Sequence, residues 1–131
     1  PRHPSIYADL LSKKIRENDN KCWLINTGWV AGGYGESNRI KIRWTRALLN
    51  AALRGDLEDV VFVEDERFGF SVPLECEGVP SEILQPRETW SDKQRYDNVA
   101  NLLAQMFREN FQQYEEGCSE EVLASSPKVL L

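Results

Sequence analysis

The feature that most constrains the fold is a long amphipathic helix predicted from Ser91 to Gly117. Apolar side chains recur there at steps of three and four residues, which places them along one side of an α-helix. These residues are Tyr96, Val99, Leu102, Leu103, Met106, Phe107, Phe111 and Tyr114. A stripe at helical spacing is typical of a core or an interface. The helix must therefore pack against other apolar surface, and the sequence leaves open whether that surface belongs to this chain.

Shorter elements are predicted on both sides of this helix. Helices are expected at residues 4–18, at 46–54 with Thr45 as N-cap and Gly55 as stop, and at 119–126 with Ser119 as N-cap. Strands are expected at residues 22–25 and 39–43, and a hairpin at 60–63 and 68–72. Residues 74–90 carry three glycine or proline breaks, which predict an ordered loop with at most one helical turn. The expected fold class is α/β, with a few short strands and three or four helices.

Length and charge limit the classes of partner. With 131 residues and 41% apolar content, the chain is large enough for one domain with a buried core. The net charge is -5, and the 16 basic residues are interspersed among 21 acidic ones. This pattern argues against a nucleic-acid surface or an anionic membrane surface. No apolar run approaches the roughly 20 residues of a membrane-spanning helix, so no membrane partner is expected.

The cysteines and the histidine do not form a recognisable reactive or metal-binding pattern. Cys22, Cys76 and Cys118 are widely separated, and His3 is the one histidine. This predicts no zinc site, no disulfide framework and no Ser-His-Asp triad. A reducing cytoplasm suits three unpaired cysteines, with a mitochondrial location as the alternative once a transit peptide has been removed.

A glycine-rich loop is the strongest candidate for a binding function. Four of the eight glycines fall between residues 28 and 35, and the basic segment "RIKIR" follows. The loop matches neither the G-x-G-x-x-G nor the G-x-x-x-x-G-K-[ST] phosphate-binding pattern. Arg39 and Thr45 could instead hold a planar anionic ligand, Arg39 by stacking or pairing and Thr45 by reading a polar edge. The alternative is a surface turn followed by a solvated strand.

The order of segments resembles the C-terminal portion of ATP-dependent phosphoenolpyruvate carboxykinase. The segments are "HPSIYADLLSKKI", "CWLINTGWVAGGYGESNRIKIRWTRALLNAAL", "FGFSVP", "GVP", "ILQPRETW" and "MFRENFQQY". The resemblance covers essentially residues 1–131, as a single segment of the family's nucleotide-binding domain. Its most specific part is the succession N-T-G-W, glycine loop, R-I-x-I and T-R-A.

The resemblance implies a function and a set of site residues. Enzymes of this family are lyases of gluconeogenesis that convert oxaloacetate and ATP into phosphoenolpyruvate, ADP and carbon dioxide, with magnesium and often manganese. Arg39, Ile40 and Thr45 match the positions that hold the adenine end of the nucleotide. Arg39 would lie against the base, Ile40 would add an apolar wall, and Thr45 would hydrogen-bond a base edge.

The resemblance also implies that this chain is not catalytic alone. The family's phosphate-binding loop, metal ligands and oxaloacetate-binding residues have no match in these 131 residues. Phosphoryl transfer depends on such groups for positioning and electrostatic stabilisation. We therefore expect a piece of a carboxykinase, one chain of a split enzyme, or a non-catalytic structural or assembly subunit derived from the fold.

Overall fold

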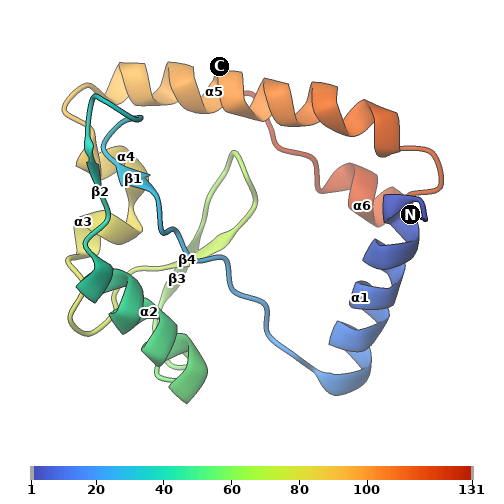
Figure 1. Cartoon of the computed structure of the whole chain (residues 1–131), viewed down its shortest axis with the longest axis horizontal. Helices are drawn as coiled ribbons and strands as arrows, with labels where there is room; N and C mark the ends of the chain where they lie inside the picture. Colours follow the sequence, from blue (N-terminus) through green and yellow to red (C-terminus); the bar gives the residue numbers. More distant parts are fainter. Residues whose placement is uncertain (1, 131) are drawn as a thin grey trace.

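The computed structural model describes residues 2–130, which form helices and two small antiparallel sheets. The elements are α1 (Pro4–Asn18), β1 (Trp29–Val30), β2 (Asn38–Arg39), α2 (Ile42–Arg54), β3 (Phe62–Glu64), β4 (Ser71–Pro73), α3 (Ser81–Leu84), α4 (Pro86–Thr89), α5 (Lys93–Phe111), a 3-10 turn (Gln112–Tyr114) and α6 (Glu120–Ala124). In Figure 1, α5 runs along one edge, α2 to α4 lie at one end, and α1 and α6 lie at the other. This mixture of helices with a few short strands confirms the predicted fold class.

Several predicted boundaries coincide with local capping chemistry. Pro4 occupies the first turn of α1, and Gly55 ends α2 with a φ of 80° in the left-handed region. The Asp92 side chain accepts a 2.9 Å hydrogen bond from the Arg95 backbone N–H at the start of α5. Ser119 caps α6 in the same way. The predicted hairpin is also confirmed, since Val63 lies opposite Val72.

The predicted strand at residues 22–25 is wrong. The segment is extended, and its burial alternates, but it pairs with no other strand among residues 2–130. Trp23 packs against the core, with its ring centroid 6.1 Å from that of Phe62. The alternation therefore reflects side-chain packing of an extended linker, and the backbone pairing begins later, at Trp29.

The predicted strand at residues 39–43 is correct only at its first position. β2 ends at Arg39, Lys41 is the N-cap residue, and α2 begins at Ile42. Thr45 is therefore not an N-cap: it lies inside the first turn, and its backbone N–H bonds to the Lys41 carbonyl. The alternating sequence "RIKIR" therefore spans the end of β2 and the start of α2 and is not a single strand.

Residues 74–90 are more helical than predicted. They contain α3 and α4, each of one turn, after an isolated bridge between Cys76 and Val79. Pro80 precedes α3 and Pro86 begins α4. Proline is accepted at the start of a helix, because the first backbone N–H groups have no partner within the helix. The prolines interpreted as loop signals therefore lie at the starts of helices here.

The core is small and lies between α2, α3 and the segment after β4. Its buried residues are Ala51, Leu57, Cys76 and Leu84, with partly buried Trp23, Leu48, Ala52, Val60, Val72 and Val79 around them. Burial raises the pKa of the Cys76 thiol, which keeps it protonated. Within residues 2–130, Cys22 and Cys118 are likewise not in disulfides, and no helix is long and apolar enough to cross a membrane.

A polar cluster joins the hairpin, α5 and the C-terminal tail. The buried Arg67 donates from Nε to Asn101 Oδ1 at 2.9 Å. The same Asn101 oxygen accepts from the Leu130 backbone N–H at 3.0 Å, and Asn101 Nδ2 donates to the Leu130 carbonyl at 2.6 Å. Asp97 lies 3.8 Å from Arg67 Nη2, and its hydrogen bond with Arg87 lowers the pKa of the Asp97 carboxyl. The side-chain amide of Asn101 on α5 thus connects this helix to the hairpin and to the C-terminal tail.

We predict that Asn101→Ala destabilises the chain by about 2 kcal/mol, because it removes one partner of the buried Arg67 and both hydrogen bonds between Asn101 and Leu130. Urea denaturation followed by circular dichroism measures the change. Asn98→Ala, an exposed position one turn earlier on α5, is the matched control and should change stability by less than about 0.5 kcal/mol. Equal stability of the two variants would contradict the assigned role of Asn101.

Candidate functional site

The glycine-rich loop is the turn of a two-stranded antiparallel hairpin. β1 and β2 pair with Trp29 opposite Arg39 and Val30 opposite Asn38. Within the turn, Ser37 Oγ donates to the Gly33 carbonyl at 3.0 Å. Gly35 has a φ of 83°, a conformation that glycine adopts without steric cost. The loop is therefore an ordered turn with its own internal bonds.

An asparagine organises the entry to this hairpin. Asn26 Oδ1 accepts a 2.8 Å hydrogen bond from the Gly28 backbone N–H, and Asn26 Nδ2 donates to the Trp29 carbonyl at 3.3 Å. The Gly28 carbonyl in turn accepts from the Ile40 backbone N–H at 2.8 Å. The N-T-G-W sequence thus fixes the turn that sets β1 against the chain leaving β2.

Arg39 is exposed and lies against an aromatic ring. Its guanidinium carbon is 5.1 Å from the centroid of the Trp29 ring, and Nη2 donates to the Thr27 carbonyl at 3.3 Å. Strand pairing brings the two side chains together, since Trp29 is the direct partner of Arg39. The Arg39 guanidinium is thereby held close to the Trp29 ring at the protein surface.

The other two predicted site residues follow directly in the chain. Ile40 is 8% exposed and so belongs mainly to the packed interior. Thr45 is half-buried in the first turn of α2, and its hydroxyl makes no hydrogen bond to another residue of the described range 2–130. The structure places all three residues along one strand-to-helix connection, visible in Figure 1 where β2 leads into α2.

A second group of cations and aromatic rings lies at the start of α2. Lys41 Nζ is 4.8 Å from the Trp44 ring centroid, and the Arg43 guanidinium carbon is 5.4 Å from it. Together with Arg39, these side chains make the connection strongly positive and suited to an anionic ligand. Sequence analysis identified the basic residues but missed Trp29 and Trp44, whose roles depend on strand register and helix geometry.

An ion pair ties the loop to a distant helix. Arg95 Nη2 contacts Glu36 Oε1 at 2.7 Å and Oε2 at 2.8 Å, although the two residues are 59 positions apart. The Arg95 guanidinium carbon also lies 5.9 Å from the Trp90 ring centroid. Both members of the pair are about half exposed, so the contact is screened by salt. No sequence pattern predicted this pair.

We predict that Arg95→Glu speeds backbone amide exchange in residues 31–37 about threefold, as expected for a surface ion pair worth about 0.6 kcal/mol. The double variant Glu36→Arg, Arg95→Glu should restore the original exchange rate, because it reverses the pair. Hydrogen exchange read by mass spectrometry at low salt measures the rates, and high salt should remove the difference. An unchanged rate in the single variant at low salt would show that the pair does not hold the loop.

The described residues 2–130 form no grouping suited to a metal ion at this connection. Residues 2–130 contain no grouping of three or more His, Cys, Asp and Glu side chains that could hold a metal ion. A groove of about 820 Å³ is lined by residues of α1 and by Arg2, far along the chain from Arg39. Arg39, Lys41 and Arg43 are exposed, so a ligand bound to them would be enclosed only if another surface covered it.

Comparison with known proteins shows which enzyme family this chain resembles. Residues 1–82 match the family model for phosphoenolpyruvate carboxykinase. The phosphoenolpyruvate carboxykinase (ATP) of Flavobacterium johnsoniae is 50% identical over 127 residues, which is 97% of this chain and 24% of that relative. The enzymes of that name from Thermus thermophilus and Caldanaerobacter subterraneus are 51% and 49% identical over 128 residues, again 24% of each relative.

The chain belongs to the phosphoenolpyruvate carboxykinase (ATP) family. It spans about a quarter of the length of the curated relatives that it matches. The resemblance inferred from the segment order is therefore confirmed.

Proposed function

We propose that this chain is the adenine-side nucleotide-binding section of an ATP-dependent phosphoenolpyruvate carboxykinase. The whole enzyme would convert oxaloacetate and ATP into phosphoenolpyruvate, ADP and carbon dioxide, as a lyase of gluconeogenesis. Residues 1–131 would form one segment of its nucleotide-binding domain. A cytoplasmic location belongs to this proposal, because three free cysteines suit a reducing compartment.

The observation that carries the proposal is the arrangement of Arg39 on Trp29. The Arg39 guanidinium carbon lies 5.1 Å from the Trp29 ring centroid, and a guanidinium held at one ring could also stack on a purine base at little further cost in entropy on binding. The positive charge of Lys41 and Arg43 close by would favour the triphosphate of ATP over a neutral ligand.

Ile40 and Thr45 would complete the adenine contact. Ile40 is anchored in the packed interior, so its backbone and the base-facing edge of its side chain are held firmly. Thr45 carries a hydroxyl whose hydrogen-bonding capacity is not used by residues 2–130. That hydroxyl could donate to or accept from a polar edge of the base, which gives selectivity as well as affinity.

The chemical step would depend on groups outside this segment. The proposed enzyme uses magnesium and manganese, yet the described residues offer no cluster suited to a metal ion. We therefore assign no step of phosphoryl transfer or decarboxylation to these residues. In this proposal, the segment binds and orients the adenine base of ATP. The segment alone would have no catalytic activity.

We predict that Arg39→Ala weakens ATP binding about tenfold, corresponding to about 1.4 kcal/mol for a lost cation–aromatic contact. The measurement is calorimetric titration of a chimera in which this chain replaces the matching region of the Thermus thermophilus relative. Arg54→Ala, an exposed arginine at the opposite end of α2 paired with Asp56, is the control and should leave the Kd for ATP unchanged. An unchanged Kd in Arg39→Ala would contradict the assignment of Arg39.

We predict that Thr45→Val weakens ATP binding about fivefold, since it keeps the side-chain shape and removes about 1 kcal/mol of hydrogen bonding. The chimera carrying Thr45→Val should bind GTP with the same Kd as the chimera without the substitution, because guanine presents a different polar edge from adenine. An equal loss of affinity for both nucleotides would mean that Thr45 supports the fold and does not read the base.

The second candidate function is a non-catalytic structural or assembly subunit that keeps this part of the fold. It is favoured by apolar side chains of α1 and α5 that lie exposed, among them Leu10 and Met106, because such side chains are typical of an assembly surface. The two functions differ in nucleotide binding: a subunit of this kind would assemble with its partner equally well with Arg39 or alanine at that position, and its assembly would ignore ATP.

A further inference from the structure

The loop between β1 and β2 carries an exposed aromatic ring beside the candidate nucleotide site. Tyr34 is 88% exposed, and its ring centroid lies 5.7 Å from that of Trp29, with the two ring planes at 75°. Trp29 is also the ring next to the Arg39 guanidinium. Tyr34 and Arg39 therefore share one aromatic neighbour, and a base stacked on Arg39 would lie close to the loop that carries Tyr34.

We propose that Tyr34 is a further nucleotide-binding residue, an aromatic wall for the adenine base, and that the ion pair of Glu36 and Arg95 positions it. This inference rests on the proposed function, because it adds residues to the same nucleotide site. Glu36 and Arg95 make no contact with the nucleotide in this proposal. They act through the position of the loop, residues 31–37.

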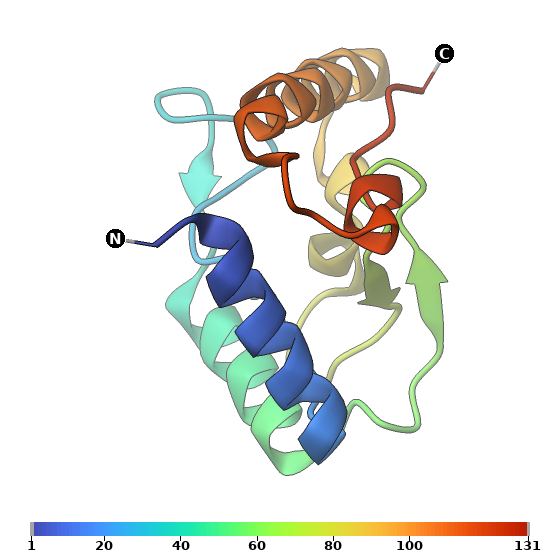
Figure 2. The ribbon, with the colours of Figure 1, turned by 90° about the vertical axis from the view of Figure 1, so that its right-hand side faces the viewer.

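The ion pair is the polar contact that ties the loop to a distant element. Within residues 2–130, the hydrogen bonds of residues 31–37 stay inside the hairpin, except for those of Glu36 with Arg95 at 2.7 Å and 2.8 Å. In Figure 1 the loop lies at the end of the molecule where α5 begins, and in Figure 2 it projects at the left of the ribbon. The position of the loop therefore depends on this one contact.

Arg95 is itself held in place on α5. Its backbone N–H donates to Asp92 Oδ1 at 2.9 Å, and its guanidinium carbon lies 5.9 Å from the Trp90 ring centroid. The Trp90 ring in turn packs edge-on against Tyr96, with the centroids 5.7 Å apart. A cation restrained in this way loses less side-chain entropy on pairing with Glu36 than a freely rotating one would.

The backbone of the loop is strained, which makes its position sensitive to the ion pair. Ala31 has a φ of 67°, in the left-handed region that is costly for a residue with a Cβ atom. The chain is also tight at Gly32, where an added Cβ would lie 3.3 Å from Ser37 Cβ. The ion pair offsets part of this cost. The fraction of molecules that hold Tyr34 beside Trp29 therefore depends on the pair.

Nucleotide affinity would follow that fraction. When a protein binds in one of two exchanging conformations, the apparent Kd equals the intrinsic Kd divided by the fraction in the binding conformation. Loss of the ion pair lowers this fraction without removing any group that touches ATP. The expected rise in Kd is about threefold, the size typical of a half-exposed ion pair.

Calorimetric titration with ATP at low salt tests the inference in the Thermus thermophilus chimera that carries this chain. Arg95→Glu and Glu36→Arg should each raise the Kd about threefold, and the double variant should restore it. Glu36→Arg is the decisive variant: it makes the site more positive, so long-range charge alone would lower the Kd for an anionic nucleotide. At high salt, the single variants and the unsubstituted chimera should have equal Kd values, because salt screens the pair.

Two substitutions test the ring of Tyr34 directly. Tyr34→Ala should raise the Kd about threefold and remove any further effect of Arg95→Glu, whereas Tyr34→Phe should leave the Kd unchanged. Because Tyr34 is largely exposed, neither substitution should lower Tm.

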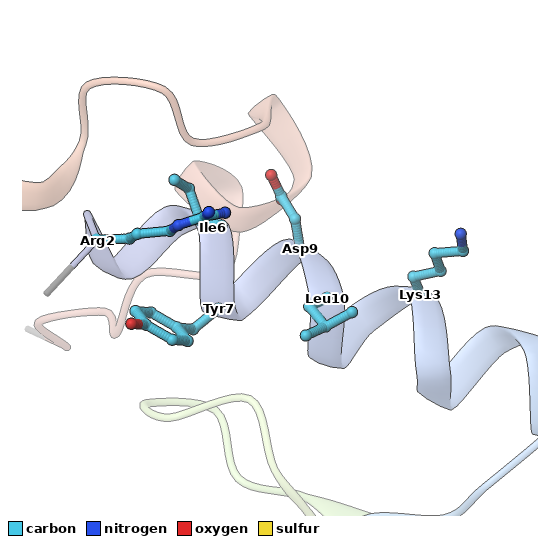
Figure 3. Close-up of a pocket in the computed structure, with 6 residues that line it drawn as sticks. All are labelled: Arg2, Ile6, Tyr7, Asp9, Leu10 and Lys13. Carbon is cyan, nitrogen blue, oxygen red and sulfur yellow. The ribbon is translucent and has the colours of Figure 1, made fainter.

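Lys13→Glu is the matched control for the change of charge. It reverses a positive charge in an exposed ion pair with Glu17 on α1, at the end of the molecule away from the loop. Figure 3 shows the Lys13 side chain projecting from α1 at one end of the groove on that helix. This variant should leave the Kd for ATP unchanged.

Three results would overturn the proposal: an unchanged Kd in Tyr34→Ala, an unchanged or lowered Kd in Glu36→Arg, or an equal effect of Arg95→Glu with tyrosine and with alanine at position 34. They are distinct from failure of the proposed function. An unchanged Kd in Arg39→Ala contradicts the nucleotide site itself, whereas weakened binding in Arg39→Ala with an unchanged Kd in Tyr34→Ala rejects only the role of the loop.

Discussion

The buried guanidinium of Arg67 is the constraint on which the assembly of this chain depends. It comes from the tip of the β3–β4 hairpin, a two-stranded sheet of three residues per strand that has little stability alone. Burial of a charge is costly without partners, and α5 supplies them through Asn101 and Asp97. Because Asn101 also bonds the backbone of Leu130, the same requirement holds the C-terminal tail in place. The polar cluster therefore fixes α5 against the hairpin and the tail, alongside the buried Ala100 and Ala104 of the same helix.

Local patterns predicted the elements whose signals are contained within a few residues. The caps at Asp92 and Ser119 and the stop at Gly55 are local chemistry, and the structure has them where the sequence predicted. Patterns failed where two elements share one run of residues. The alternation through Ile40 and Ile42 was interpreted as one strand, although the chain leaves the sheet after Arg39 and enters a helix. An alternating pattern cannot show where a strand ends and a helix begins when both elements contribute residues to it.

The candidate site was predictable in its residues and not in its geometry. Arg39 and Thr45 were predicted as ligand-binding residues because they are polar and follow a glycine-rich loop, and the family resemblance added Ile40. The Trp29 ring under Arg39 follows from strand register, which short strands specify weakly in sequence. The pair of Glu36 and Arg95 joins residues 59 positions apart, so only the folded chain reveals it. The roles of Arg39, Ile40 and Thr45 in binding stay predictions.

The aromatic side chains give this segment an optical property. Trp29, Trp44 and Trp90 each have a lysine or arginine close to the ring, whereas Trp23 packs against the apolar core. Indole emission responds to a charge near the ring, so the four tryptophans should differ in wavelength and intensity. A base that draws the guanidinium of Arg39 toward itself would change the emission of Trp29 without a label. The contact that orients the arginine would thus also serve as an intrinsic fluorescent reporter of its position.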